Sequence, residues 1–262
     1  MRENKEKETR ELFLRLDDLK KCAIRGEIGV SAFFSPRESF YAKKYLDGRG
    51  DAYIAFGGYR GAQRERIYLL PEYMESTSDV YGFSDFGSDS GIAALMIKGS
   101  GFVRLSHRDF MGALLGLGIE RSVLGDIVTL DESSAVVFCD TRIAEFLAIH
   151  LETVGRDKVK IGSAVIGEDF TPEIKVAPIG DTVASPRLDC VVGALCSLSR
   201  ERAKEAICEE LVELDYESVT RPDKEIVAPC LISVRGYGKF RILSLSDRTK
   251  KGRYRLLAEK FL

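Results

Sequence analysis

The sequence predicts a multidomain protein of the α+β class. With 262 residues, the chain is longer than a typical single small domain. Along it, apolar residues recur at helical spacing in some segments and alternate as in strands in others. We place three regions at residues 1–78, 79–180 and 181–262. The composition, 45% hydrophobic and 31% charged, is that of an ordinary globular protein.

Nothing in the sequence suggests insertion into a membrane. The first eight residues are too highly charged for a signal peptide. No apolar run approaches the roughly 18 residues that a membrane-spanning helix needs. We therefore expect a cytoplasmic protein, and we expect it to be a monomer.

The cysteines and histidines do not suggest a metal centre. The six cysteines form no C-x-x-C pair, and only His107 and His150 could serve as imidazole ligands. Zinc sites need closely spaced ligand pairs, so we predict no bound metal and no cofactor. The cysteines predicted to pack in the core, because they lie among apolar neighbours, are Cys139, Cys190, Cys196 and Cys208.

The first region is predicted to be an N-terminal α/β unit. It begins with an amphipathic helix that stops at Gly26. The apolar face of this helix consists of Leu12, Leu16, Leu19 and Ala23. Ser35 opens a capping box, which predicts a second helix ending near Gly48. Residues 52–56 and 66–70 then have the pattern of strands.

The segment between these strands, residues 57–61, is rich in glycine and could suggest a nucleotide-binding loop. It lacks the Gly-Lys-Ser/Thr end of a P-loop and any G-x-G-x-x-G pattern ahead of a helix, so we reject that interpretation. Arg60, Arg64 and Arg66 could contact RNA or could equally pair with local acids. Residues 72–90, which are polar and rich in Ser, Asp and Gly, are predicted to be a linker.

The central region has the pattern of a strand, a helix, two strands, a helix and a strand. The strands are predicted at residues 92–97, 127–130, 135–139 and 159–166, and the helices from the capping box at Ser106 and over residues 143–154, ended by Gly155. This βαββαβ order is that of the ferredoxin-like fold, which RNA-recognition (RRM-like) modules also use. The strand at 135–139 offers one aromatic residue, Phe138, so base stacking on it is weakly supported.

The last region is predicted to fold as two short helices followed by a small sheet. Ser185 is a suitable N-cap for the first helix, with Pro186 at the first helical position, and Ser199 caps the second. Beyond the helices, a glycine turn at residues 236–238 joins two strands. A polar linker is predicted before this region, at residues 168–182.

Basic charge is concentrated at this end of the chain. Residues 1–183 carry 24 basic and 29 acidic residues, whereas residues 235–255 carry eight basic residues and one acidic residue. Arg200 and Lys204 lie one turn apart on the outer face of the second predicted helix. Outward cations of this kind suit a phosphate backbone, because neutralised phosphates release counterions. A charged, solvated surface without a ligand is the alternative.

Several spaced motifs in this region resemble an S4-type RNA-binding domain. They are Arg-Leu-Asp at 187–189, Ser-Arg at 199–200 and Val-Arg-Gly-Tyr-Gly-Lys-Phe at 234–240. Together with residues 249–253, they are similar to the C-terminal S4 domain of YlmH-type proteins. Glu210 departs from the pattern, since S4 domains usually carry Gly there, and Asp215 stands in place of the usual Asn. Because Glu tolerates a left-handed backbone poorly, the RNA surface at this corner is in doubt.

The central region also resembles YlmH-type proteins, at residues 107–112, 117–119 and 125–127. His107 and Arg108 would lie at a helix N-terminus, which favours phosphate. The resemblance implies a protein that binds rRNA and tRNA at the large ribosomal subunit, in quality control or rescue of stalled translation. The residues predicted to bind RNA are Arg187, Ser199, Arg200, Lys204, Arg235, Lys239, Arg241, Lys250, Lys251, Arg253, His107 and Arg108.

Two other functions stay open at this point. The triplet at 187–189 resembles the Arg-Leu-Asp around the catalytic aspartate of pseudouridine synthases, so an RNA-modifying enzyme that docks through its S4 domain is one alternative. However, residues 87–91 carry Asp89 where a nucleophile elbow needs Ser, and no spacing suggests a Cys/His or Ser/His pair. We therefore predict no enzymatic activity. A cell-division-associated adaptor, suggested only by the naming of the family, is the other alternative.

Overall fold

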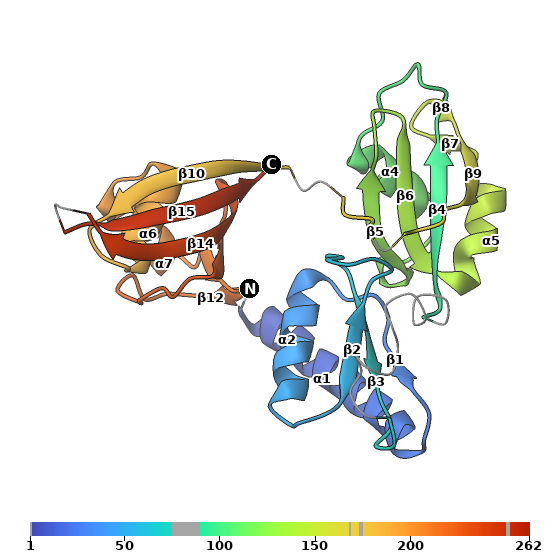
Figure 1. The fold of residues 1–262 in the computed structure, drawn as a ribbon, viewed down its shortest axis with the longest axis horizontal. Coiled ribbons are helices and arrows are strands. Elements are labelled where there is room, and N and C mark those ends of the chain that lie inside the picture. The colour runs from blue at the N-terminus through green and yellow to red at the C-terminus, as the bar shows by residue number, and fades with distance from the viewer. Residues whose placement is uncertain (1, 75–89, 168, 173–174, 250–251) are drawn as a thin grey trace. The chain divides into compact units, whose positions relative to one another are not determined.

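The structure is a computed structural model with a mixed α+β fold, as predicted (Figure 1). It describes residues 2–74, 90–167, 169–172, 175–249 and 252–262. The chain divides into two compact units, Met1–Pro172 and Glu173–Leu262. Most of the predicted linker at 72–90 lies outside the described residues. No helix in the described part of the chain is long and apolar enough to cross a membrane.

The N-terminal part of the first unit packs two helices against a three-stranded sheet. Its elements are α1 (Arg2–Ile24), α2 (Pro36–Asp47), β1 (Gly29–Val30), β2 (Tyr53–Phe56) and β3 (Arg66–Leu69), with the strand order β1-β3-β2. Leu12 and Leu16 of α1 share a core with Ile67 of β3. The capping box predicted for α2 is confirmed, because Ser35 Oγ accepts from the N–H of Glu38 (3.3 Å) and the Glu38 carboxylate accepts from the N–H of Ser35 (2.8 Å).

The central part of the first unit follows the predicted order of elements. These are β4 (Ile92–Lys98), α4 (His107–Gly116), a short 3₁₀ turn (Arg121–Val123), β5 (Leu124–Thr129), β6 (Ser134–Asp140), α5 (Thr141–His150) and β9 (Lys160–Ser163). The sheet order is β5-β6-β4-β9, and all neighbouring strands are antiparallel. The capping box at Ser106 is confirmed, since Asp109 accepts from the N–H of Ser106 at 2.8 Å.

The second helix of the central part is shorter than predicted. Helix α5 ends at His150, and the chain then forms a hairpin of β7 (Thr153–Val154) and β8 (Asp157–Lys158). Gly155, which we expected to end the helix, lies in the hairpin turn with a φ of 58°. Val154 is fully buried in the core of the sheet. Val154 is therefore apolar because the hairpin packs into the core. It also falls at helical spacing from the apolar residues of α5, which explains why the helix was predicted to continue to residue 154.

Both faces of the four-stranded sheet are covered near Phe138. One face packs against α4 and α5. The other face carries Val136 and Phe138, and it is covered by side chains from two distant segments: Tyr59, Ala62, Ile166 and Phe170. Phe138 is 1% exposed, and its ring centroid lies 4.9 Å from that of Tyr59 and 6.1 Å from that of Phe170. A base cannot stack on Phe138 in this arrangement, so the aromatic residue considered for RNA stacking belongs to the core.

The glycine-rich segment at residues 57–61 provides part of this cover. A Cβ on Gly58, which has a φ of +102°, would lie 2.4 Å from Phe138 Cδ1, and a Cβ on Gly57 would lie 2.2 Å from the Arg64 carbonyl oxygen. Only glycine allows the backbone to approach this closely. Close packing therefore explains the glycines here, in agreement with our rejection of a nucleotide-binding loop.

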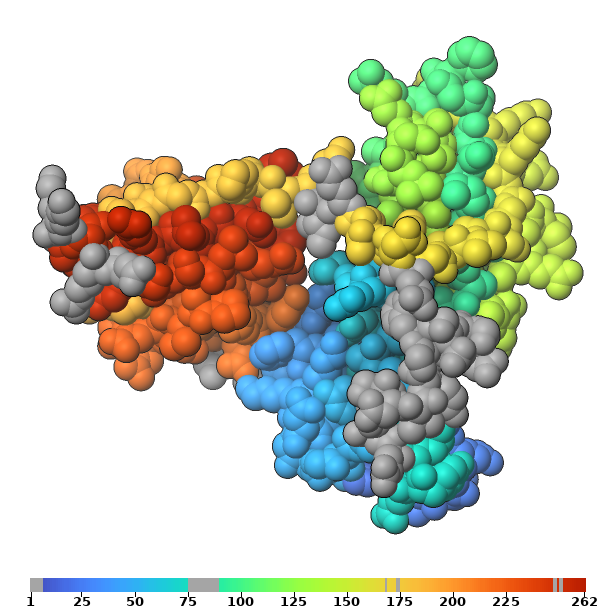
Figure 2. Space-filling view, in the orientation of Figure 1, coloured from blue at the N-terminus to red at the C-terminus, as the bar shows by residue number. Residues whose placement is uncertain are grey.

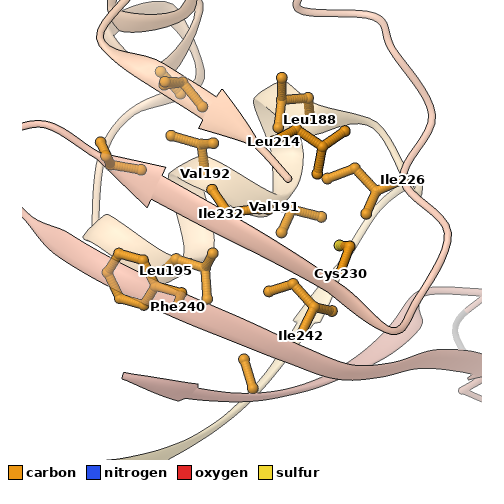
Figure 3. Close-up of a cluster of buried hydrophobic side chains, with 14 of the residues drawn as sticks. Leu188, Val191, Val192, Leu195, Leu214, Ile226, Cys230, Ile232, Phe240 and Ile242 are labelled. Carbon is orange, nitrogen blue, oxygen red and sulfur yellow. The ribbon is translucent and has the colours of Figure 1, made fainter. Parts of the chain in front are cut away.

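The second unit places two helices on one face of a six-stranded antiparallel sheet. Its elements are β10 (Val176–Val183), α6 (Leu188–Cys196), α7 (Arg200–Cys208), β11 (Val212–Leu214), β12 (Glu217–Ser218), β13 (Cys230–Val234), β14 (Gly238–Arg248) and β15 (Tyr254–Phe261). The sheet order is β10-β15-β14-β13-β11-β12. Val191 and Val192 of α6 pack with Ile232, Phe240 and Ile242 of the sheet (Figure 3).

The linker predicted at 168–182 is wrong from residue 176 onward. Residues 176–183 form β10, which pairs in register with β15 from Val176↔Phe261 to Val183↔Tyr254. Pro178 and Gly180 gave this segment the composition of a linker. Both are tolerated because β10 is an edge strand that bonds on one side only.

The predicted start of the first helix in this unit is also wrong. Helix α6 begins at Leu188 with Arg187 as its N-cap residue, so Ser185 and Pro186 lie outside it. The first backbone N–H groups of the helix are bound by distant carbonyls, since Leu188 donates to Lys224 (2.8 Å) and Asp189 donates to Pro222 (3.0 Å). A side-chain cap is not needed there. Ser199, in contrast, caps α7 as predicted.

Candidate nucleic-acid interface

The first turn of α6 holds a buried aspartate between two arginines. Asp189 is 0% exposed, and Arg187 donates to both of its carboxylate oxygens, at 3.1 Å from Nε to Oδ1 and 3.0 Å from Nη2 to Oδ2. Arg200 Nε donates to Oδ2 at 3.2 Å. Burial acts to raise the pKa of Asp189, but the hydrogen bonds from Arg187 and Arg200 outweigh it and lower the pKa. The carboxylate therefore stays ionised and fixes both guanidinium groups.

The side chains that hold Asp189 still reach solvent. Arg187 is 34% exposed and Arg200 is 57% exposed. Lys204 lies one turn after Arg200 on α7 and is exposed, while Ala203 and Ile207 of the same helix are buried. We call Arg187, Arg200 and Lys204 the α6–α7 basic face. Ser199 contributes by capping α7, because its Oγ accepts from the N–H of Arg202 at 3.3 Å.

The cations of β14 do not join this face. Phe240 and Ile242 point into the core beneath α6 and α7, so Lys239 and Arg241, which alternate with them, lie on the opposite face of the sheet. The predicted RNA-binding cations of the tail therefore lie on more than one surface. Strand alternation separates Lys239 and Arg241 from Arg200.

Lys239 and Arg241 also have partners within the protein. Lys239 Nζ lies 4.9 Å from the ring centroid of Tyr216 and 5.7 Å from that of Phe261. Burial and the neighbouring Arg241 lower the pKa of Lys239. Arg241 Nη1 lies 3.6 Å from Glu259 Oε2. Arg235, in the turn after β13, is exposed, and its backbone N–H donates to Leu211 at 2.9 Å.

The remaining predicted cations of the tail follow β14 in the sequence. Arg253 binds the end of β10, since its Nε donates to Thr182 Oγ1 at 2.9 Å and its Nη2 donates to the Thr182 carbonyl at 2.5 Å. Lys250 and Lys251 lie outside the described residues. Arg253 is therefore fastened to β10.

The two positions that depart from the S4 pattern both have left-handed backbones. The φ angles are 58° at Glu210 and 48° at Asp215. Asp215 suits its position, because its carboxylate accepts from the N–H of Leu231 at 2.8 Å. No matching contact of the Glu210 side chain occurs among the described residues. The expectation that Glu fits poorly where Gly is usual agrees with this geometry.

His107 and Arg108 lie in the first turn of α4, as predicted. Both are exposed, and the backbone donors at this end are partly satisfied by the capping box of Ser106 and Asp109. Partial desolvation and the neighbouring Arg121 lower the pKa of His107. The lowered pKa favours the neutral form of His107, so Arg108 and Arg121 supply the positive charge at this helix end.

Two of the three arginines in the first region have structural partners. Arg64 is buried and donates to three backbone carbonyls: Leu124 (2.9 Å), Phe33 (3.0 Å) and Arg121 (2.8 Å). Arg66 is buried and pairs with Asp140 at the end of β6. Only Arg60 is exposed. Arg66 therefore pairs with an acid, which was one of the two possibilities left open, whereas the Arg64 side chain binds backbone carbonyls instead.

The described residues contain no group of three or more His, Cys, Asp or Glu side chains that could hold a metal ion. Cys139 is buried, and burial raises the pKa of its thiol to about 12. Cys190 and Cys196 pack against the core of the second unit. Cys208 is exposed, so its prediction as a core residue is wrong. It lies at the end of α7, where the outer face of the helix turns to solvent.

Comparisons with known proteins connect the chain to YlmH. Residues 87–168 match a family described as "Putative RNA-binding domain in YlmH". The chain is 29% identical over 235 residues to the "Ribosome-associated protein quality control protein P2" of Bacillus subtilis (strain 168), covering 88% of this chain and 86% of that protein. The resemblance to YlmH-type proteins is confirmed by these matches, whereas an S4 domain is not among them.

A solved structure supports the fold. The "Cell division protein ylmH from Streptococcus pneumoniae" superposes with a TM-score of 0.50 and 22% identity, over 60% of this chain and 92% of that one. At this level of identity, the similarity concerns the fold alone.

Proposed function

We propose that this YlmH-type protein binds structured RNA, both rRNA and tRNA, on the large ribosomal subunit, in quality control or rescue of stalled translation. Support comes from its similarity to a Bacillus subtilis protein that is named for ribosome-associated quality control. The family match of residues 87–168 supports RNA binding. Such a role would place the protein in the cytoplasm.

We also propose three domains for this role. The strand order β5-β6-β4-β9 is that of a ferredoxin-like fold, which supports an RRM-like central domain. Two helices on an antiparallel sheet, together with the motifs at 187–189 and 199–200, support an S4-like C-terminal domain. Because β10 is a full member of the last sheet, we place the start of that domain near residue 173 instead of 181.

The observation that carries the RNA-binding proposal is the α6–α7 basic face. Asp189 binds both Arg187 and Arg200, and the two arginine side chains stay partly exposed. A guanidinium with a fixed orientation loses little conformational entropy when it binds a phosphate. Lys204 adds a third cation on the same side of α7. Arg108 at the start of α4 is a candidate for a separate phosphate contact.

The alternative of an RNA-modifying enzyme has less support. A pseudouridine-synthase-like role would need Asp189 as a nucleophile, but its carboxylate is buried and bound by Arg187, Arg200 and the N–H of Cys190. The Bacillus subtilis relative is named for quality control. We therefore propose a binding protein without enzymatic activity.

The proposal can be tested by co-sedimentation of the protein with large ribosomal subunits across a salt series. Wild-type protein should bind, and the logarithm of its binding constant should fall linearly with the logarithm of the salt concentration. Arg200→Ala with Lys204→Ala should weaken binding and should lower the slope by about two, about one for each phosphate that the variant no longer neutralises.

A matched control removes two exposed cations from the first unit, Arg10→Ala with Arg25→Ala, which changes the net charge equally. This variant should retain the wild-type slope. Wild-type protein that stays unbound at every salt concentration would contradict the proposed function. If the two double variants instead lose equal amounts of ribosome affinity, the affinity depends on net charge and the α6–α7 basic face has no special role.

A further inference from the structure

We propose that the end of the four-stranded sheet around Phe102 binds a single-stranded RNA segment. One base would stack on Phe102, and phosphates would lie on Lys98 and Lys160. We call these three residues the sheet-end site. The inference rests on the proposed function, and it assigns an RNA contact within residues 87–168 that the sequence did not suggest.

The first observation is a pair of lysines directly opposite each other. Lys98, the last residue of β4, is the cross-strand partner of Lys160, the first residue of β9. Their neighbours Ile97 and Ile161 pack into the core beneath α4 and α5, so both lysines point from the other face of the sheet. Both are exposed, and neither forms an ion pair with a described residue. Like charges in this position are destabilising unless an anion lies between them.

The carboxylates at this end of the sheet are already engaged. Asp131 accepts from the N–H of Ser133 (2.7 Å) and from the hydroxyl of Ser134 (2.7 Å). Glu132 Oε2 lies 3.0 Å from Arg104 Nε. Asp157 accepts from the N–H of Ser100 at 2.8 Å. None of these three acids pairs with Lys98 or Lys160, so the two lysines remain available for an anionic ligand.

The second observation is an exposed aromatic side chain on a loop that is fixed at both ends. The loop joins β4 to α4 and lies beyond the end of β4 (Figure 1), and it projects from the surface in the space-filling view (Figure 2). At its start, the N–H of Gly99 donates to Ser133 (2.8 Å), and at its end the N–H of Leu105 donates to Glu132 (2.7 Å). Phe102, between these anchors, is 95% exposed. The loop therefore presents a phenyl ring that no part of the core requires.

Glycine shapes this loop. Gly101 has a φ of +85°, which favours glycine, and a Cβ on Gly99 would lie 2.5 Å from Asp157 Oδ2. The close approach at Gly99 holds the loop against the hairpin of β7 and β8, and the turn at Gly101 directs the chain outward before Phe102. The backbone at both ends of the loop is therefore fixed in advance of any ligand, which reduces the entropy lost on binding.

RNA fits these observations better than a protein partner does. Proteins that bind single strands combine cations along the backbone with aromatic side chains under the bases. The usual stacking surface of an RRM-like sheet is closed here, because Tyr59 and Phe170 cover Phe138. Phe102, together with the partly exposed Val103 and Leu130, offers little of the apolar area that a protein interface buries.

The test uses the full-length protein and a fluorescent single-stranded RNA of about ten nucleotides and mixed sequence. Phe102→Ala should weaken binding roughly 5- to 150-fold, the range found when one base–aromatic stack is removed. Phe102→Trp, which keeps a ring, should restore it. Lys98→Ala with Lys160→Ala should lower the salt slope by about 1.4, since each phosphate on a single strand contributes about 0.7. Arg104→Ala, which removes a cation already paired with Glu132, is the matched control and should leave the slope unchanged.

The outcomes separate this proposal from the proposed function. If Phe102→Ala and the double lysine variant bind the RNA like wild type while wild type still sediments with ribosomes, the sheet-end site is refuted and the function stands. If wild type binds neither ribosomes nor the RNA, both proposals fail. A photo-crosslinking residue placed at position 102 should join to RNA in ribosome complexes. A crosslink only to ribosomal protein would also overturn the assignment.

Discussion

Two buried aspartates, one in each unit, are held by arginines that differ in their exposure. Asp140 binds Arg66, whose side chain is 6% exposed, and also the surface residue Arg142. Asp189 binds Arg187 and Arg200, which are 34% and 57% exposed. A guanidinium enclosed like that of Arg66 serves only the fold, whereas partly exposed groups can also meet a phosphate. The burial of the cation, which the sequence does not reveal, distinguishes the two roles.

The largest expected effect is the loss of stability when Asp140 is removed. Asp140→Ala leaves the Arg66 charge buried without its partner, which should lower the free energy of unfolding of the first unit by about 3–5 kcal/mol. Asp189→Ala should cost less, about 1–3 kcal/mol for the missing charged hydrogen bonds, because Arg187 and Arg200 can turn to solvent. Hydrogen exchange of the full-length protein, followed on peptides of each unit, measures both changes.

Asp18→Ala provides the exposed reference point of this series. Asp18 pairs with Lys21 at 2.6 Å, and both side chains are exposed. Its removal should change stability by less than about 1 kcal/mol. The expected order of losses is therefore Asp140, Asp189 and Asp18. An equal loss for Asp140 and Asp189 would contradict the argument that the burial of the arginine separates them.

Low pH should destabilise the first unit because it protonates Asp140. Hydrogen bonds from Arg142 lower the pKa of Asp140 despite the opposing effect of burial, and Arg66 lowers it further. A carboxyl group with a lowered pKa in the folded state stabilises fully above its unfolded value of about 3.9, and this stability is lost as pH falls below that value. Unfolding free energies measured from pH 7 to pH 2.5 should fall less steeply for Asp140→Asn than for wild type. Parallel curves would show that Asp140 is not the group responsible.

Local signals in the sequence predicted many elements correctly. The capping boxes at Ser35 and Ser106 and the cap at Ser199 were found because a cap depends on residues within one turn. The start of α6 was missed because its donors are bound by carbonyls of Pro222 and Lys224, more than 30 residues away. Signals of this kind depend on tertiary structure and are not visible in a local pattern.

The candidate site was only partly predictable, for the same reason. Helical spacing placed Arg200 and Lys204 on one outer face. The alternation of Lys239 and Arg241 with two apolar residues of the same strand places them on the face opposite the core. The burial of Asp189 beneath Arg187 and Arg200 depends on how α6 and α7 pack, which no spacing fixes. Phe102 was missed because an exposed aromatic residue in a loop has no periodic signature.

The cations of β14 and those of the α6–α7 basic face are expected to differ in their contribution to ribosome binding. Lys239→Ala with Arg241→Ala should change ribosome binding less than Arg200→Ala with Lys204→Ala, because Lys239 lies between Tyr216 and Phe261 and Arg241 faces Glu259. Removal of these cation–π interactions should instead lower stability by about 1–2 kcal/mol. Salt-dependent co-sedimentation and urea unfolding measure the two properties. A larger binding loss for the β14 pair would place the main RNA surface on the opposite face of the sheet.

The smallest expected effect concerns Glu210, at the end of α7 remote from Arg200. Glu210 has a φ of 58°, a left-handed conformation that costs a non-glycine residue roughly 1–2 kcal/mol. Glycine relieves this strain but adds about 0.4–1 kcal/mol of entropy to the unfolded chain. Glu210→Gly should therefore stabilise the second unit by about 0.5–1 kcal/mol, as measured by hydrogen exchange on its peptides.

Glu209→Gly is the matched control, since it removes the same charge one residue earlier, at a φ of −80° that any residue adopts. There glycine only increases the entropy of the unfolded chain, so stability should fall by about 0.4–1 kcal/mol. If Glu210→Gly raises the stability and Glu209→Gly lowers it, the gain at position 210 comes from the relief of backbone strain and not from the loss of a charge. If both variants instead raise RNA affinity equally, the acidic corner repels the ligand electrostatically, and the RNA surface extends along the whole of α7 instead of ending near Lys204.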